Sequence, residues 1–108
     1  GDLNIAHNPI DIHDPVGNKK SSGFLPEERA WMDQWVASGF VDAFRSIHPN
    51  KVQYSWWSFR ANSRGNNKGW RIDYQMVSPE MKETIIAADQ LNDIIHSDHC
   101  PVQVMYQL

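Results

Sequence analysis

Residues 1–6 alternate between apolar and polar side chains. Leu3 and Ile5 fall on one face of an extended segment, and Asp2 and Asn4 fall on the other. Strict alternation is the pattern of a short strand with one buried face. Because successive side chains point to opposite faces of a strand, the first segment predicts a strand that carries an acid and an amide on the same side.

A helix is predicted between Pro26 and Gly39. A proline followed by two acidic residues is a favourable helix start, and a glycine is a common stop. Trp31 and Trp35 lie about one helical turn apart and form part of an apolar stripe. We expect these two tryptophans to pack on a sheet.

The rest of the chain is dominated by strand-like segments. Residues 54–59 and 71–78 flank a polar loop at 61–68, and this arrangement predicts a hairpin. A short helical turn is expected after Pro79, and the alternation in residues 101–108 predicts a half-exposed final strand. The order of strand, helix and then several strands predicts an α+β arrangement of layers.

Length and charge limit the possible functions only loosely. The 108 residues suit one modest domain. A formal net charge of -3 counts against a general nucleic-acid binder, which usually carries a basic surface. Basic side chains nevertheless gather in two short stretches where they could contact phosphates. These are Lys19 and Lys20, and then Arg60, Arg64, Lys68 and Arg71.

Cys100 is the single cysteine, so an internal disulfide is excluded and a reducing compartment is favoured. We therefore expect an intracellular protein, located in the cytoplasm or, in a eukaryote, in the nucleus. No apolar run is long enough to cross a bilayer, and we expect no leader before the first motif. Domains rarely begin on a site residue, which predicts that these residues are the second part of a larger unit.

Side chains suited to phosphodiester chemistry follow three predicted strand ends: Asp2, Asn4, Asp73, Asp98 and His99. Carboxylates bind hard cations and prime water, and a carboxylate can orient a histidine. Because neighbouring side chains diverge, Asp98 is expected to face a metal while His99 faces a phosphate. Asp73 is then the candidate for fixing the tautomer of His99. The alternative is a set of ordinary polar groups on solvated surfaces.

A second candidate feature is an apolar pocket. Trp70 and Ile72 share one face of their segment, and an aromatic residue from positions 55–58 could join them. Such a pocket could receive a sugar that lacks its base while it excludes a normal nucleotide. In the alternative interpretation these are core residues, and Arg71 and Asp73 form an internal ion pair.

Several segments in order resemble the exonuclease III family of apurinic/apyrimidinic endonucleases, in the endonuclease/exonuclease/phosphatase superfamily. The likeness runs over essentially the whole chain. The matching segments are Gly1-Asp2-Leu3-Asn4, Gly17-Asn18-Lys19-Lys20, Gly23-Phe24 with Pro26-Glu27-Glu28-Arg29, Gly69 to Tyr74, and Ser97 to Pro101.

The resemblance implies a four-layer α/β sandwich, in which two facing β-sheets are flanked by helices. It also implies Mg²⁺-dependent cleavage of double-stranded DNA on the 5′ side of an abasic site, with Mn²⁺ as an alternative ion. Exonuclease activity in the 3′–5′ direction or 3′-phosphodiesterase activity would fit the same family.

The resemblance further implies a role for individual residues. Asp2 would activate the water and lie at the metal with Asp98, and Asn4 would hold the phosphate and the water. His99, oriented by Asp73, would contact the scissile phosphate. The implied substrate-binding residues are Asn18 and Ser21 in a DNA-contacting loop, Arg60 inserted into the duplex, and Trp56, Trp70 and Ile72 around the abasic sugar.

Members of this family are about twice as long as this chain. Residues 1–108 would therefore be the C-terminal part of a single domain, without the N-terminal half that supplies a metal-binding glutamate. The partner that covers the exposed sheet would be that missing half or a second copy of the chain. Two other functions stay open: another phosphodiesterase or phosphatase of the superfamily, or an inactive fragment that only binds DNA or a partner half.

Overall fold

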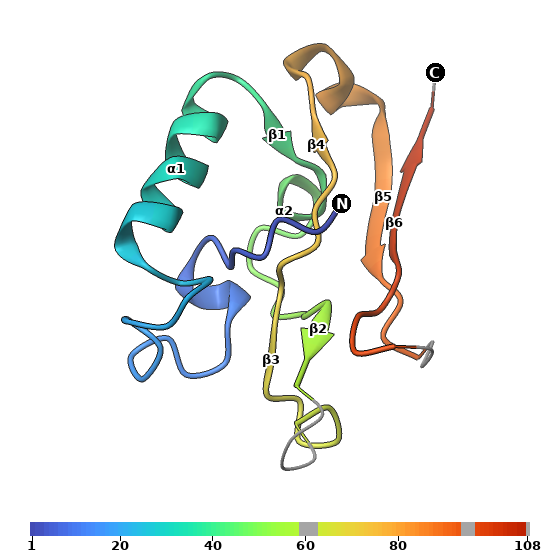
Figure 1. The fold of residues 1–108 in the computed structure, drawn as a ribbon. Helices are drawn as coiled ribbons and strands as arrows, with labels where there is room; N and C mark the ends of the chain where they lie inside the picture. Colours follow the sequence, from blue (N-terminus) through green and yellow to red (C-terminus); the bar gives the residue numbers. More distant parts are fainter. Residues whose placement is uncertain (59–62, 94–96, 108) are drawn as a thin grey trace.

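The computed structural model describes residues 1–58, 63–93 and 97–107. Helices and strands are mixed along the chain (Figure 1), which confirms the α+β class. With η for a 3₁₀ helix, the elements are η1 (Pro9–Asp11), α1 (Pro26–Ala37), β1 (Val41–Asp42), α2 (Ala43–Ile47), β2 (Trp56–Trp57), β3 (Gly69–Trp70), β4 (Met76–Val77), η3 (Pro79–Thr84), β5 (Ile85–Gln90) and β6 (Val102–Tyr106). Within the described residues, no helix has the length and apolar character needed to cross a membrane.

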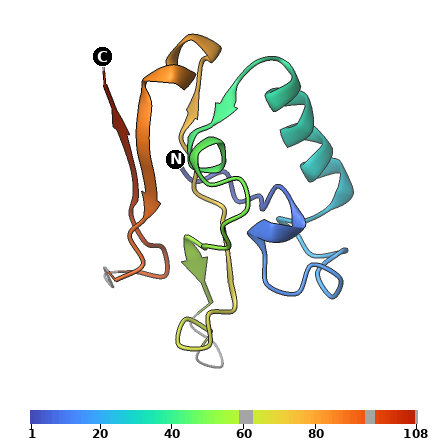
Figure 2. The ribbon, with the colours of Figure 1, turned by 180° about the vertical axis from the view of Figure 1, so that it is seen from behind.

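The described strands form three antiparallel pairs, β1 with β4, β2 with β3, and β5 with β6. Seen from behind, α2 lies in front of the strands (Figure 2), and it packs against them through Ala43, Val77 and Ile85. The molecule measures 42 × 32 × 21 Å. Its shortest dimension fits two layers, since a helix and a sheet each take about 10 Å.

Helix α1 begins and ends where the sequence predicts. Glu28 accepts hydrogen bonds from the backbone N–H groups of Gly23 and Leu25 at 2.7 and 3.1 Å, which satisfies donors at the helix start. Gly39 follows the helix with a φ of +112°. The expected packing of both tryptophans on a sheet is wrong for Trp31, which is 49% exposed. Its ring instead lies against that of Trp35.

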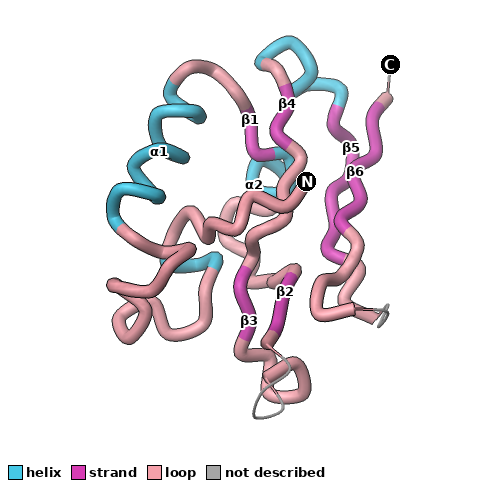
Figure 3. Tube along the Cα trace, in the orientation of Figure 1, coloured by secondary structure: helices cyan, strands magenta, loops and turns pink. Residues whose placement is uncertain are grey.

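Two predicted strands are shorter in the structure than the alternation suggests. Residues 1–6 form no regular strand, and their single ladder contact is an isolated bridge between Asp2 and Asp73. The stretch 71–78 is regular only in β4. A hairpin does form, but β2 pairs with β3 at Gly69–Trp70, directly before the predicted partner strand. The final strand is confirmed as β6, whose residues alternate between partly buried and exposed. As Figure 3 shows, the chain before α1 is almost entirely loop.

Arg71 explains why residues 71–78, the central segment of the chain, do not form one continuous strand. Its guanidinium is buried and donates from Nε to Asp11 at 2.8 Å and from two nitrogens to Asp42 at 3.0 and 2.6 Å. Its backbone N–H donates to the backbone oxygen of Asp11 at 2.7 Å, and Arg45 also pairs with that carboxylate. The alternative pairing of Arg71 with Asp73 is wrong, because Asp11 and Asp42 take all these bonds.

Ser55, directly before β2, holds the same segment from another part of the chain. Its side chain is fully buried, and its hydroxyl oxygen accepts the N–H groups of Ile72 and Asp73 at 3.0 and 3.1 Å. Its backbone N–H donates to the carbonyl oxygen of Trp70, and its own carbonyl oxygen accepts from the backbone N–H of Cys100 at 2.8 Å. One small residue therefore joins the segment after β3 to the segment before β6.

We predict that the buried ion pairs make folding sensitive to acid. Burial opposes ionisation of Asp11, but the charges and hydrogen bonds of Arg71 and Arg45 outweigh it and lower the pKa of that carboxyl. The stabilisation from ionised Asp11 is complete above its ordinary pKa near 4 and is lost as the pH falls through the lower folded value. The free energy of unfolding should show this loss when chemical unfolding is measured between pH 7 and pH 2 on the full-length protein that its source organism encodes.

The matched pair for this prediction is Asp11→Asn and the exposed Asp93→Asn. The first change leaves buried guanidinium charge without its partner and should cost about 3–5 kcal/mol at pH 7. Its stability should also fall less steeply below pH 4. Equal unfolding free energies for the two variants at pH 7 would contradict the assignment.

We also predict that Ser55→Ala destabilises the protein. The change removes the acceptor of the buried Ile72 N–H and the partly buried Asp73 N–H. A buried N–H left without a partner costs about 1–3 kcal/mol. Ser22→Ala is the control, because Ser22 is exposed. In urea unfolding, the free energy of unfolding of Ser55→Ala should be well below that of the control and of the unmodified protein. A value equal to that of Ser22→Ala would refute the prediction.

Candidate active site

Backbone pairing brings the three predicted strand ends together. Asp2 forms a bridge with Asp73, and His99 forms a bridge with Trp56. Leu3 donates its N–H to the carbonyl of Ile72 at 3.0 Å, which fixes the register of the first segment. Segments from the beginning, middle and end of the chain therefore meet at one place.

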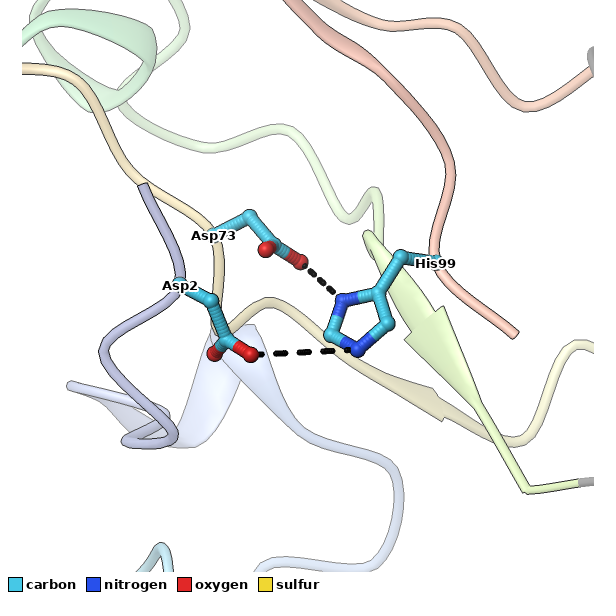
Figure 4. A group of neighbouring side chains, drawn as sticks. All are labelled: Asp2, Asp73 and His99. Atoms are coloured by element: carbon cyan, nitrogen blue, oxygen red, sulfur yellow. Dashed lines mark hydrogen bonds and ion pairs between the residues drawn. The ribbon is translucent and has the colours of Figure 1, made fainter. Parts of the chain in front are cut away.

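Asp2, Asp73 and His99 form a cluster at this meeting point (Figure 4). The Nδ1 atom of His99 lies 2.8 Å from Asp73 Oδ2, and its Nε2 atom lies 3.8 Å from Asp2 Oδ2. A carboxylate only accepts, so the proton of this short contact resides on Nδ1. Asp73 therefore fixes the tautomer of the ring, and this contact between Asp73 and His99 is the one expected from the sequence. The same orientation of the ring turns Nε2 toward Asp2.

The cluster favours the charged form of the histidine. Burial opposes a charged imidazole, but the hydrogen bond and charge of Asp73, helped by Asp2 and Asp98, raise the pKa of His99 above its ordinary value. The ring is then more often cationic near neutral pH. A partly exposed imidazolium is suited to contact a phosphate oxygen.

The carboxylates fit a divalent cation chemically. One ligand atom from each of Asp2, Asp73 and His99 lies within 4.8 Å of the others. Asp98 lies outside this group and lines the neighbouring cavity, where its Oδ2 accepts from the indole of Trp56 at 3.0 Å. Mg²⁺ is usually held by one or two carboxylates together with waters and substrate phosphates, and these residues can supply such carboxylates.

The backbone conformation that places Asn4 at the site differs from the strand that the alternation predicts. It has a positive φ of 57°, and its N–H donates to Asp2 Oδ1 at 2.9 Å. The expected strand with both side chains on one face is therefore wrong. Asparagine tolerates the left-handed conformation, and the nearby carboxylate offers its N–H a local partner. Asn4 still lines the cavity beside Asp98 and His99.

The cavity has a volume of about 670 Å³ and contains most of the predicted substrate-binding residues. It is lined by Asn4, Ser21, Ser22, Trp56, Trp70, Ile72, Asp98 and His99. The Trp56 and Trp70 rings are 6.0 Å apart and nearly perpendicular. Trp56 is thus the aromatic residue left open by the sequence, whereas Trp57 is buried with Tyr54 and Cys100.

Gly23 permits the close packing of Trp70. Its φ is +96°, and a Cβ atom there would lie 2.7 Å from the ring of Trp70. A side chain at this position would therefore displace one wall of the cavity. The glycine in the motif before α1 is required both by its backbone conformation and by this contact.

The predicted DNA-contacting residues divide into three cases. Ser21 lines the cavity, while Asn18 does not. The Asn18 amide donates to two backbone oxygens of its own loop, and its Oδ1 accepts from the Ser21 hydroxyl at 3.0 Å. Arg60 lies outside the described residues.

Sequence reasoning missed Ser55 and Ser22. Ser55 positions Asp73 through the N–H of that residue, and Ser22 lines the cavity. A small polar residue directly before the aromatic pair was the available signal for Ser55, because a fully buried hydroxyl must find hydrogen-bond partners. No comparable signal marked Ser22.

Comparison with known proteins identifies the family. The model of the Endonuclease/Exonuclease/phosphatase family matches residues 1–99. An exodeoxyribonuclease from Bacillus subtilis is 45% identical over 109 residues, which cover 100% of this chain and 43% of that protein.

Two solved structures superpose on the whole chain. The AP endonuclease LMAP from Leishmania major has a TM-score of 0.91 and 35% identity, and 34% of it is covered. The 3′ phosphatase NExo from Neisseria, bound to a product DNA hairpin, has a TM-score of 0.93 and 28% identity, with 44% covered. The chain thus spans less than half the length of each of these proteins. Its resemblance to the exonuclease III type is confirmed, and it belongs to the endonuclease/exonuclease/phosphatase family.

Proposed function

We propose that this chain forms part of an Mg²⁺-dependent DNA repair endonuclease that cleaves the phosphodiester bond 5′ to an abasic site. The observation that carries the proposal is a cluster of two carboxylates and an imidazole beside a cavity with aromatic walls. The names of the relatives support a nuclease acting on DNA. The same centre could serve 3′–5′ exonuclease or 3′-phosphodiesterase activity, since only the position of the phosphodiester differs.

Each residue of the centre has a chemical task in this proposal. Asp2 would orient and deprotonate the attacking water, because its carboxylate is exposed and lies near the imidazole of His99. The cationic His99, held by Asp73, would bind a non-bridging oxygen of the phosphate and stabilise the charge that develops there. The side-chain amide of Asn4, which faces the same cavity, would hold the phosphate and the water.

The resemblance assigns Mg²⁺ to Asp2 and Asp98, and Asp98, although outside the group of Asp2, Asp73 and His99, lines the same cavity as His99. The ion, when bound, would supply further positive charge at the phosphate. Mn²⁺ has a similar preference for oxygen ligands and should replace it. Because the chain covers less than half of its relatives, we infer that it is the C-terminal part of a single domain. The other part of that domain would complete the metal site and cover the sheet, and a second copy of the chain is the alternative cover.

The walls of the cavity support the proposed preference for an abasic sugar. Trp56, Trp70 and Ile72 present apolar surface beside the reactive groups. A deoxyribose without its base can enter such a space, whereas a nucleotide that keeps its base must also accommodate the much larger base. Double-stranded DNA is therefore the proposed partner, with Ser21 and the basic loop side chains near its backbone.

We predict an Mg²⁺-dependent nick beside the lesion. The protein as its source encodes it should cleave an end-labelled duplex that contains one tetrahydrofuran abasic analogue, directly 5′ to that analogue. The same duplex without the lesion should stay intact, and EDTA should abolish the cleavage. Gel analysis gives both the position and the rate.

A panel of rival substrates completes this test. It contains DNA with a 3′-phosphate, single-stranded RNA, a mononucleotide and a phospholipid. A higher kcat/KM for any of the last three would replace the proposal with another phosphodiesterase or phosphatase of the family. An encoded protein that binds the abasic duplex without cleaving anything would favour the inactive DNA-binding alternative.

We predict that Asp2→Asn, Asp73→Asn and His99→Asn each lower kcat by about a hundredfold or more, because each change removes an electrostatic or proton-transfer contribution. Their circular dichroism spectra should match that of the unmodified protein. Asp93→Asn makes the same chemical change at an exposed position outside the centre and should keep full activity. Full activity in His99→Asn would remove the assignment of the centre.

A further inference from the structure

Trp56 contacts two parts of the candidate site at once. Its ring lines the cavity, and its indole N–H donates to Asp98 Oδ2 at 3.0 Å. The backbone holds both partners in register, because Trp57 donates its N–H to the carbonyl of Asp98 at 3.0 Å and Trp56 forms a bridge with His99. The indole–carboxylate contact is therefore built into the pairing of the two segments.

The contact leaves one carboxylate oxygen available. Among the described residues, Asp98 Oδ1 has no hydrogen-bond partner, while Oδ2 is occupied by the indole. A carboxylate held through one oxygen loses rotational freedom and presents the other in a fixed direction. Neighbours of this kind orient metal ligands in proteins and raise their affinity for the ion.

Trp70 provides an internal comparison. It forms the other aromatic wall of the cavity, with its ring 6.0 Å from that of Trp56. Within the part of the chain that the structure describes, its indole nitrogen makes no hydrogen bond. If a tryptophan served only as a wall, a phenylalanine would serve nearly as well in either place, and the indole N–H of Trp56 would be dispensable.

We propose that Trp56 is a positioning residue that orients the Asp98 carboxylate toward a divalent cation, in addition to forming a wall of the cavity. The inference rests on the proposed function, because that function assigns Asp98 to the cation. One side chain then links the surface that receives the sugar to the carboxylate that holds the ion.

The test compares Trp56→Phe with Trp70→Phe in the protein as its source encodes it. Both variants keep an aromatic wall, but only the first loses a hydrogen bond to a carboxylate. Mn²⁺ alone is titrated without DNA and the free ion is followed by its electron paramagnetic resonance signal, with Mg²⁺ as competitor. Trp56→Phe should bind about tenfold more weakly than the unmodified protein, and Trp70→Phe should bind with unchanged affinity.

A double-mutant cycle with Asp98→Ala then identifies the path of the effect. If Trp56 acts through Asp98, adding Trp56→Phe to Asp98→Ala should cause no further loss of Mn²⁺ affinity. Independent, additive losses would overturn the positioning role. Equal Mn²⁺ affinity in Trp56→Phe and the unmodified protein would overturn it directly.

A spectroscopic measurement covers the case in which Trp56→Phe does not fold. In protein that keeps Trp56, the indole N–H resonance of this residue should shift when Mg²⁺ is added. It should also shift in the Asp98→Ala variant. An unchanged resonance in both measurements would refute the inference. Failure of the proposed function looks different: the unmodified protein would then neither bind Mn²⁺ nor cleave abasic DNA. Intact binding and cleavage with no Trp56 effect would remove only this inference.

Discussion

The buried guanidinium of Arg71 is the constraint on which the rest of the structure depends. A charge taken out of water is strongly unfavourable unless it is paired and hydrogen-bonded, and here two carboxylates, from Asp11 and Asp42, meet it. Asp11 belongs to η1, before the loop of residues 12–25 that leads to α1. Asp42 precedes α2, and its side chain accepts a hydrogen bond from the Arg45 N–H at the start of that helix. Few alternative packings could satisfy all of these groups, so the ion pairs specify how the loop, the helix and the central segment fit together.

The position of Arg71 also determines what its neighbours can do. Trp70 and Ile72, on either side, line the cavity while the arginine itself is buried. Asp73 follows, with its N–H on the Ser55 hydroxyl and its carboxylate on His99. Four consecutive residues therefore contribute a wall, an anchor, a second wall and the carboxylate that holds His99. A shift of one residue in this segment would exchange the cavity walls for charged side chains.

Sequence reasoning succeeded where a chemical need was local or strong. A histidine placed for phosphate chemistry needs a carboxylate to fix its tautomer, and that need correctly selected Asp73 as the contact of His99. It failed where a long-range partner replaced the nearest one: Arg71 pairs with Asp11 and Asp42 across the fold rather than with Asp73. It also failed at Asn4, because the Asp2 carboxylate accepts the N–H of that residue and the segment turns. Alternation alone could not distinguish Trp56 from Trp57, since burial depends on what packs across the hairpin.

Under the proposed function, recognition and chemistry depend on the same structural supports. Trp56 forms a wall of the cavity and bridges to His99, while Ser55 beside it joins the segments that carry Asp73 and His99. A substitution that moves β2 must therefore disturb the cavity and the cluster of Asp2, Asp73 and His99 together. Such coupling has a physical advantage: a sugar seated between the aromatic walls would have its phosphate held against the same rigid elements that carry the imidazole and the carboxylates. Orientation of the reacting groups would then follow from binding itself, which lowers the entropy barrier of a hydrolysis.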